Sequence, residues 1–280
     1  MILFGVQMPP PDQIQGSCTS GETAFTDRTS SGSRITELAR VAATAMSALM
    51  ICTPLLFAAR PKTPLRVFCI AAFEFLARLG GDTLGKQRRI AIAHACDFGS
   101  LRDDYYDRRV VDATKYRSLR SKLRSIAPEK GTSRYIRQLR QAERCRPILT
   151  SGNPGTANSV IAYRTSVLDL SLRWMQELSG LHIDSMRFHV LLNLVGLMQL
   201  ADDVLDWKED QAVACPSYVT AFLMDLPCNA VVLPLREQAD TLLQRLIAAA
   251  RRDTGAVPLA IAGVLTWTCV VALLRLRFPQ

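Results

Sequence analysis

One segment, 198–210 (MQLADDVLDWKED), restricts the fold of this chain most strongly. It places Gln199, Asp203, Asp206 and Asp210 at spacings of four, three and four, which is one face of an α-helix. The residues before it, HVLLNLVGL, are nearly all apolar, so the acidic residues extend a helix that should be buried. Ionised carboxylates avoid apolar surroundings unless a cation meets them. The segment therefore predicts a buried helix whose acidic face binds a divalent metal ion.

The rest of the chain is predicted to be helical as well. Apolar residues recur with helical spacing, and no segment alternates convincingly with period two. The expected helices are 34–59, 65–79, 84–110, 113–126, 131–146, 157–179, 184–211, a short one to 224, 234–252 and a last apolar one at about 256–274. Residues 1–33 are rich in Pro, Ser, Thr and Gly. We therefore expect an all-α protein, with a disordered tail at 1–33 and a single helical domain at 34–280.

A second acidic cluster, DDYYD, lies near the end of the predicted helix 84–110. Asp103 and Asp107 are four residues apart and share a face, with Asp104 beside them. The same face continues backwards through small residues that leave room for a ligand: Cys96, Gly99 and Ser100. Alone, the cluster also fits a solvated acidic turn. Two such clusters on separate helices favour a shared site, because Mg²⁺ commonly binds one or two carboxylates together with substrate phosphates.

Both clusters resemble motifs of the class I isoprenoid synthases, which are the polyprenyl diphosphate synthases, squalene/phytoene synthases and class I terpene cyclases. DDYYD (103–107) matches their first aspartate-rich motif, DDxxD. QLADDVLD (199–206) matches the second motif of polyprenyl synthases, QxxDDxxD, and DWKED (206–210) matches the DxxED of squalene and phytoene synthases. The resemblance implies an all-α bundle around a deep apolar pocket, with Mg²⁺ at its mouth and a prenyl diphosphate as substrate.

The resemblance also implies roles for individual residues. It assigns catalysis to Asp103, Asp104, Asp107 and Asp206. The implied metal ligands are Asp103, Asp104, Asp107, Asp202, Asp203, Asp206 and Asp210. The implied substrate-binding residues are Arg108, Arg109, Arg164, Gln199 and Phe98. Arg108 and Arg109 follow the first motif and Arg164 precedes the second, whereas Phe98 lies one turn before DDxxD, where bulk limits chain length in the family.

The reaction is less defined than the family. Polyprenyl synthases bind isopentenyl diphosphate through a GGKRxRP element, for which GKQRR (85–89) is only a loose counterpart. We therefore expect a single substrate, an allylic prenyl diphosphate of C15 or C20, that undergoes cyclisation or elimination. Head-to-head condensation of the squalene/phytoene type and chain elongation are the alternatives within the family. A non-catalytic, membrane-associated helical protein with incidental acidic clusters is the alternative outside it.

The basic residues indicate an anionic partner. The net charge is +9, and thirteen Lys or Arg fall between Arg108 and Arg146 against three acids. Arginines bind phosphate oxygens in pairs of hydrogen bonds. The remaining basic residues of this segment, Arg117, Arg120, Arg137 and Arg140 among them, are expected to be a solvated face or a contact to anionic lipid. The segment has too few aromatic residues for a nucleic-acid-binding module, so no nucleic-acid partner is expected.

Two uncharged runs, Val41–Ala59 and Ala256–Leu274, have nearly the length that spans a bilayer, and they are either buried core helices or membrane-associated segments. The eight cysteines form no CxxC pair, which favours a reducing compartment. We expect a cytoplasmic protein, and the sequence is compatible with peripheral membrane contact and with a homodimer. Trp174, Trp207 and Trp267 are either core residues or pocket residues whose ring faces stabilise a carbocation.

Overall fold

The computed structural model describes residues 36–46, 63–108, 112–126, 129–150 and 155–279, and these residues form an all-α protein. The predicted tail at 1–33 lies outside the described residues. Residues 36–46 are helical. The helices that follow are α2 (Thr63–Leu79), α3 (Lys86–Arg108), α4 (Ala113–Ile126), α5 (Glu129–Arg144), α6 (Thr156–Ser179), α7 (Ser185–Leu205), α8 (Trp207–Ala212), α9 (Tyr218–Leu223), α10 (Val232–Arg252), the 3₁₀ turn η1 (Thr254–Ala256) and α11 (Val257–Arg277).

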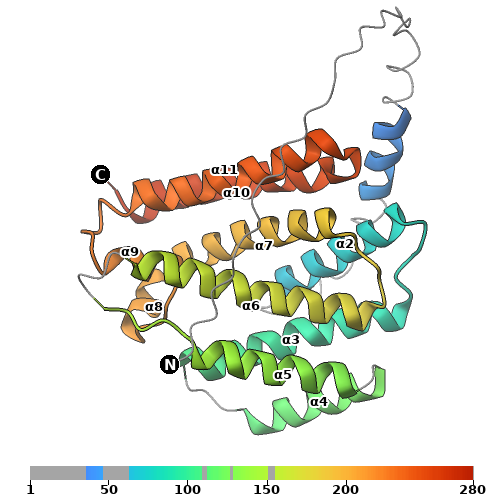
Figure 1. Cartoon of the computed structure of the whole chain (residues 1–280), viewed down its shortest axis with the longest axis horizontal. Coiled ribbons are helices and arrows are strands. Elements are labelled where there is room, and N and C mark those ends of the chain that lie inside the picture. Colours follow the sequence, from blue (N-terminus) through green and yellow to red (C-terminus); the bar gives the residue numbers. More distant parts are fainter. Residues whose placement is uncertain (1–35, 47–62, 109–111, 127–128, 151–154, 280) are drawn as a thin grey trace, which may run out of the picture.

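The long helices stack side by side, with α10 and α11 on one side of the bundle and α4 on the opposite side (Figure 1). Helix α7 packs against α10, α11 and α6, whereas α3 packs against α2, α4 and α6. Helices α3, α5 and α7 end on the same side of the bundle, where α6 begins (Figure 1). This arrangement brings the carboxyl ends of α3 and α7, which carry the acidic residues, to one end of the molecule.

Helix α7 is the central core helix. Its residues Leu191, Leu194, Leu197 and Leu200 are at most 1% exposed, because α10 and α11 cover one side and α6 another. Asp184 caps the start of the helix by accepting a hydrogen bond from the backbone N–H of Arg187 at 2.9 Å. Burial of this apolar helix stabilises the bundle, since each fully buried leucine contributes about 1.5–3 kcal/mol.

Helix α7 ends one residue before Asp206, which contradicts the expectation of one continuous helix over 184–211. Asp206 takes φ −100° and ψ 10°, and α8 starts immediately after it. The ring of Trp207 then packs against the ring of Phe278, with 5.2 Å between the ring centroids. This contact lies at the start of α8, directly after the junction. The acidic face therefore continues across a helix junction and not along one straight helix.

Two glycines occupy positions at which a side chain would be unfavourable. Gly180 takes φ 62° and ends α6 in the left-handed conformation, which allows the chain to turn into α7. A Cβ atom on Gly263 of α11 would lie 2.5 Å from Cδ1 of Leu246 on α10. A side chain at residue 263 would therefore require the flexible end of Leu246 to shift, so the glycine favours the close contact between α10 and α11.

Two described helical segments are long and apolar enough to cross a membrane, Ser185–Leu205 and Thr254–Arg277. The first is the core helix α7. The second includes α11, and only 28% of its most apolar window is buried. The predicted run at 256–274 thus forms a helix with one face on the core and one face outward. The other predicted run, 41–59, lies mostly outside the described residues.

Candidate active site

The two acidic clusters line one pocket. A cavity of about 60 Å³ lies between the end of α3, the start of α6 and the α7–α8 junction. Its lining consists of Asp103, Asp104, Asp107, Arg164, Gln199, Asp202, Asp203, Asp206 and Asp210. The structure thus brings together all seven aspartates that the sequence pattern singled out, and with them the predicted residues Arg164 and Gln199. We call this space the acidic pocket.

Asp203 is held by the protein on both of its oxygen atoms. Oδ1 accepts a hydrogen bond from Gln199 Nε2 at 2.7 Å and lies 3.6 Å from the guanidinium of Arg164. Oδ2 accepts the backbone N–H of Tyr218 at 2.7 Å, at the start of α9. Asp203 is almost completely buried. Its main structural effect is to hold the Arg164 guanidinium and the first turn of α9 at the acidic pocket.

Asp107 is paired with Arg146, which follows α5. The distance from Arg146 Nη2 to Asp107 Oδ1 is 2.6 Å. By contrast, no hydrogen bond holds the carboxylates of Asp103 and Asp206 in the part of the chain that the structure describes. These two carboxylates come from different helices and line the same space, so they are available to a ligand.

The acidic pocket contains more negative charge than its surroundings neutralise. Burial and the neighbouring carboxylate of Asp107 raise the pKa of Asp103 to about 7, with smaller contributions from Asp104 and Asp203. The side chain of Asp103 is accessible to solvent through the pocket, while protein atoms surround it elsewhere. Burial and Asp203 raise the pKa of Asp210 to about 6. Both shifts show that the ionised carboxylates are destabilised in the absence of a cation.

Arg164 is the cation of the acidic pocket. Its burial alone would lower the pKa of the guanidinium, but Asp203 and Asp103 outweigh this effect and raise it. The side chain is only 8% exposed, and its Nε has no hydrogen-bond partner among the described residues. A buried guanidinium with an unused donor next to several carboxylates is suited to an anionic ligand that arrives together with metal ions.

The donor set fits Mg²⁺. All nine lining residues except Arg164 present carboxylate or amide oxygens, and Mg²⁺ prefers oxygen ligands. Among the described residues, no three acidic, His or Cys side chains are already arranged to hold one ion. Carboxylates repel one another and separate when no cation lies between them. Mg²⁺ typically binds only one or two carboxylates and completes its coordination with water and substrate phosphates. The acidic pocket therefore matches a metal site that a diphosphate completes.

An apolar cavity of about 320 Å³ lies directly below the acidic pocket and shares Asp103, Arg164, Gln199 and Asp202 with it. Its deeper wall comes from α2, α3, α5, α6 and α7, and includes Ala95, Leu139, Val167, Leu168, Leu172, Trp174, Met175, Val195 and Met198. Cys96, Gly99 and Ser100 line the side below Asp103, where small residues were expected to leave room. A Cβ atom on Gly99 would meet no other atom within 4 Å.

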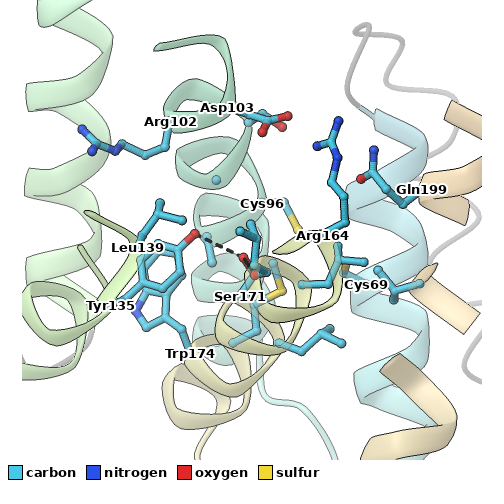
Figure 2. A pocket seen from close by; sticks show the side chains of 18 of the residues that line it. Cys69, Cys96, Arg102, Asp103, Tyr135, Leu139, Arg164, Ser171, Trp174 and Gln199 are labelled. Atoms are coloured by element: carbon cyan, nitrogen blue, oxygen red, sulfur yellow. Dashed lines mark hydrogen bonds between the residues drawn. The ribbon is translucent and has the colours of Figure 1, made fainter. Parts of the chain in front are cut away.

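Aromatic residues form one end of this cavity (Figure 2). The ring of Trp174 stacks on the ring of Tyr135 with their centroids 4.1 Å apart, and the hydroxyl of Tyr135 lies 3.2 Å from Ser171 Oγ. Of the three tryptophans considered from the sequence, Trp174 lines the cavity. Trp207 packs on Phe278, and Trp267 donates a hydrogen bond to Asp240 at 2.6 Å.

Phe98 lies behind the cavity wall. Its ring is fully buried and packs on Tyr116 and on the outer edge of Trp174, with centroids 5.3 Å and 5.7 Å away. The residues that line the cavity from this part of α3 are Cys96, Gly99, Ser100 and Asp103, so Phe98 is not brought to the predicted substrate space. Arg109 and the side chain of Arg108, both predicted to bind the diphosphate, lie outside the described residues.

Two arginines of this region escaped the sequence reasoning. Arg102 precedes DDYYD directly and lines the apolar cavity, and Arg146 pairs with Asp107. A signal for both existed in the thirteen basic residues of 108–146 and in the arginine next to the motif. No protein-family model, curated protein or solved structure matches this chain, so its likeness to isoprenoid synthases stands on its two aspartate-rich motifs.

Proposed function

We propose that this protein is a Mg²⁺-dependent enzyme of the class I isoprenoid synthase type that ionises an allylic prenyl diphosphate. The observation that carries the proposal is the position of the acidic pocket, whose two aspartate-rich segments come from separate helices and open into an apolar cavity. A prenyl diphosphate has two matching parts, a charged diphosphate head and an apolar hydrocarbon chain. The all-α bundle around this cavity supports a class I synthase fold.

The acidic pocket would bind the diphosphate head. Asp103, Asp104 and Asp107 on one side, and Asp202, Asp206 and Asp210 on the other, would hold Mg²⁺ when it is bound. The ion supplies Lewis-acid stabilisation of the departing diphosphate. Arg164 donates from its guanidinium to the diphosphate oxygens, and Asp203 positions Arg164 for this role at 3.6 Å.

The apolar cavity would bind the hydrocarbon chain and exclude water from the allylic cation. The aliphatic residues of α5, α6 and α7 form its deeper wall, and a dry cavity prevents early capture of the cation by water. Tyr135 and Trp174 form a stacked aromatic pair at this site, and aromatic faces attract a positive charge. C15 and C20 diphosphates are the proposed substrates, and cyclisation or elimination is the proposed reaction, with condensation as the alternative.

The non-catalytic alternative is less compatible with these features. A membrane-associated protein with incidental acidic clusters would place its acidic helix faces in solvent. Here Asp203 is buried, and α7 is the core helix of the bundle. Seven carboxylates around one small space are energetically unfavourable without a ligand, which supports a binding role.

We also propose that the protein is cytoplasmic and contacts a membrane peripherally through α11. The outward face of α11 exposes Ile261 and Leu265 by 57% and 64%, and Arg275 and Arg277 follow near its end. Apolar side chains flanked by arginines are typical of a helix that lies in the interface of an anionic membrane. The hydrocarbon products of the proposed cyclisation or elimination are apolar, so this contact would place their release next to lipid.

Product analysis tests the proposed activity. Purified protein would be incubated with C10, C15 and C20 allylic diphosphates and Mg²⁺, and hydrocarbon extracts would be examined by mass spectrometry. We expect a metal-dependent product from at least one substrate, which Asp103→Ala and Asp206→Ala abolish. Absence of any product from all three substrates, with folded protein, would contradict the proposal.

A further inference from the structure

A groove lies on the side of the bundle where α6, α7 and α10 meet, and it has a volume of about 610 Å³. Helix α7 packs against both α6 and α10 and lies between them (Figure 1). It therefore forms the floor of the groove, and α6 and α10 form the walls. We call this space the helix groove.

The helix groove has the length of a short helix. Helices α7 and α10 run in opposite directions, because Arg187 near the start of α7 pairs with Asp253, which follows α10, at 2.9 Å. The lining residues extend over 186–196 of α7 and over 238–252 of α10. At a rise of 1.5 Å per residue these segments are about 15 Å and 21 Å long. A helix of about 10–14 residues spans the same distance.

Most of the surface inside the helix groove is apolar. Its apolar lining includes Ile161 and Leu168 from α6, Val190 and Leu192 from α7, and Leu242 and Ala249 from α10. Met186, at one end, is 39% exposed. An open apolar groove between helices is the kind of surface into which an amphipathic helix places its apolar face.

The charges that line the helix groove are all positive. Arg245 and Arg252 are seven residues apart on α10, so they lie on the same side of the helix, and both are exposed. His189 of α7 lines the same space, whereas no carboxylate of the described residues does. Asp253 is already paired with Arg187. A basic groove without its own acidic residues is complementary to an acidic partner.

Two observations favour a peptide over a lipid chain or a second copy of this protein. Thr165, Asn193, Gln238 and Thr241 line the helix groove, and a lipid chain would remove these polar groups from water without replacing their hydrogen bonds. A peptide carries polar groups that can do so. A second copy also has a net charge of +9, which opposes its approach to a basic surface.

From these features we infer that the helix groove is a docking site for an acidic amphipathic helix of a partner protein. Docking requires neither Mg²⁺ nor a prenyl diphosphate, so it goes beyond the proposed function. Tyr218 lines the groove and donates its backbone N–H to Asp203 at 2.7 Å, and Leu168 lines both the groove and the apolar cavity. A docked helix would therefore contact residues that also border the acidic pocket and the apolar cavity.

Fluorescence anisotropy with the full-length protein tests the inference. The probes are three fluorescein-labelled peptides of about 14 residues, the length of the groove. The first has Leu on one helical face and Glu on the other, the second has Lys in place of Glu, and the third has Ala in place of Leu. We expect the Leu/Glu peptide to bind at least about tenfold more tightly than either of the others, because the groove offers both apolar surface and positive charge.

Two pairs of variants locate the binding site. Arg245→Glu/Arg252→Glu should weaken binding of the Leu/Glu peptide at least about tenfold, because two attractive charges become repulsive. Arg236→Glu/Arg251→Glu changes the net charge equally on exposed residues of α10 outside the groove, and should bind as the wild type does.

The second pair tests the apolar space without a change of charge. Thr241→Trp fills the groove from an exposed position and should also abolish binding, whereas Thr268→Trp on α11 should not.

Four outcomes would overturn the inference. The first is no binding of the Leu/Glu peptide by the wild type. The second is an equal loss in both charge-reversal variants, which would reduce the effect to overall charge. The third is a dimer in analytical ultracentrifugation that Thr241→Trp dissociates, since this would assign the groove to a second copy. The fourth is sedimentation with anionic vesicles that Arg245→Glu/Arg252→Glu abolishes while Thr241→Trp leaves peptide binding unchanged, which would assign the arginines to a lipid surface.

Discussion

Asp103 on α3 and Asp203 on α7 line the same acidic pocket, and the charge of Asp203 contributes to the raised pKa of Asp103. The two residues belong to separate sequence motifs. Their proximity in the fold turns two acidic segments, each of which also fits a solvated helix face, into one electrostatic unit. The unit has too little positive charge for its seven carboxylates: among the described residues Arg164 lines the pocket, and Arg146 pairs with Asp107.

The pH dependence of stability should reveal this shortage of positive charge in the acidic pocket. The pKa of Asp103 is about 7 in the folded protein, whereas an unperturbed aspartate has a pKa of about 3.9. Between these values the folded state holds a proton that the unfolded state has released, so stability falls as pH rises. We expect the Tm of the metal-free protein in EDTA to be lower at pH 8 than at pH 5 in differential scanning calorimetry, by a modest amount because solvent screens the exposed side chain of Asp103.

Two comparisons control this experiment. Asp103→Asn should remove much of the pH dependence and raise the Tm at pH 8 in EDTA, because it deletes a destabilised charge. Mg²⁺ should raise the Tm of the wild type at pH 8, since a ligand that binds only the folded state stabilises it. If the Tm changes from pH 5 to pH 8 by the same amount in the wild type and in Asp103→Asn, Asp103 is not the source of the pH dependence.

Arg164→Gln should reduce the release of diphosphate by about 10²–10³-fold, the loss typical for removal of one donor to a developing negative charge. It should also destabilise the protein by about 3–5 kcal/mol, because Asp203 is left buried without its counter-charge. Steady-state kinetics and urea unfolding would measure the two effects. Arg134→Gln is the matched control, since Arg134 pairs with Glu177 on the exposed surface. Unchanged turnover in a folded Arg164→Gln protein would exclude the proposed role.

If the proposed activity holds, Gly99→Leu should restrict the apolar cavity and shift the preference of the protein towards shorter prenyl diphosphates. Gly99 lines the cavity, and its Cβ would meet open space, so the larger side chain fits and occupies substrate volume. Relative kcat/KM for C10, C15 and C20 substrates would show the shift, which we expect to be at least about tenfold for loss of several methylene contacts. Gly85→Leu, at an equally open position away from the cavity, should not change the preference.

Leu265→Gln combined with Ile261→Gln should weaken binding to vesicles that contain anionic lipid, in a sedimentation assay. These side chains form the exposed apolar part of α11, and each buried methylene contributes about 0.8 kcal/mol to transfer from water. Loss of the two side chains should therefore reduce the bound fraction by at least about tenfold. Leu233→Gln is the control, because Leu233 is 65% exposed at the start of α10. Equal vesicle binding by all variants would argue against this face.

The sequence pattern predicted the helices well where apolar periodicity is strong. The expected helix over 113–126 is observed with the same bounds as α4. The break at Asp206 was not predictable in the same way, because no Gly or Pro marks it and the acidic residues continue with helical spacing. The residue after the break, Trp207, packs on Phe278, which is distant in the sequence, and local spacing contains no information about such a contact.

In the candidate site, too, local spacing predicted some residues, whereas others are brought to the site by tertiary contacts. Asp103, Asp107, Asp203 and Asp206 share helix faces, so local spacing identified them. Phe98 was placed next to the motif by its position in the chain, but it is five residues before Asp103, which is about 140° around the helix and away from the cavity. The positions of Arg102 and Arg146 at the site arise from tertiary contacts between α3 and the end of α5, which local periodicity does not contain.

The rate at which purified protein releases inorganic diphosphate from C15 and C20 allylic diphosphates tests the central claim most directly. The account predicts Mg²⁺-dependent release by the wild type and a loss of at least about 100-fold in Asp103→Asn and in Asp206→Asn alike, because both helices hold the same metal–diphosphate group. Release that persists at the wild-type rate in either variant, or no release from any allylic diphosphate by the folded wild type, would contradict it.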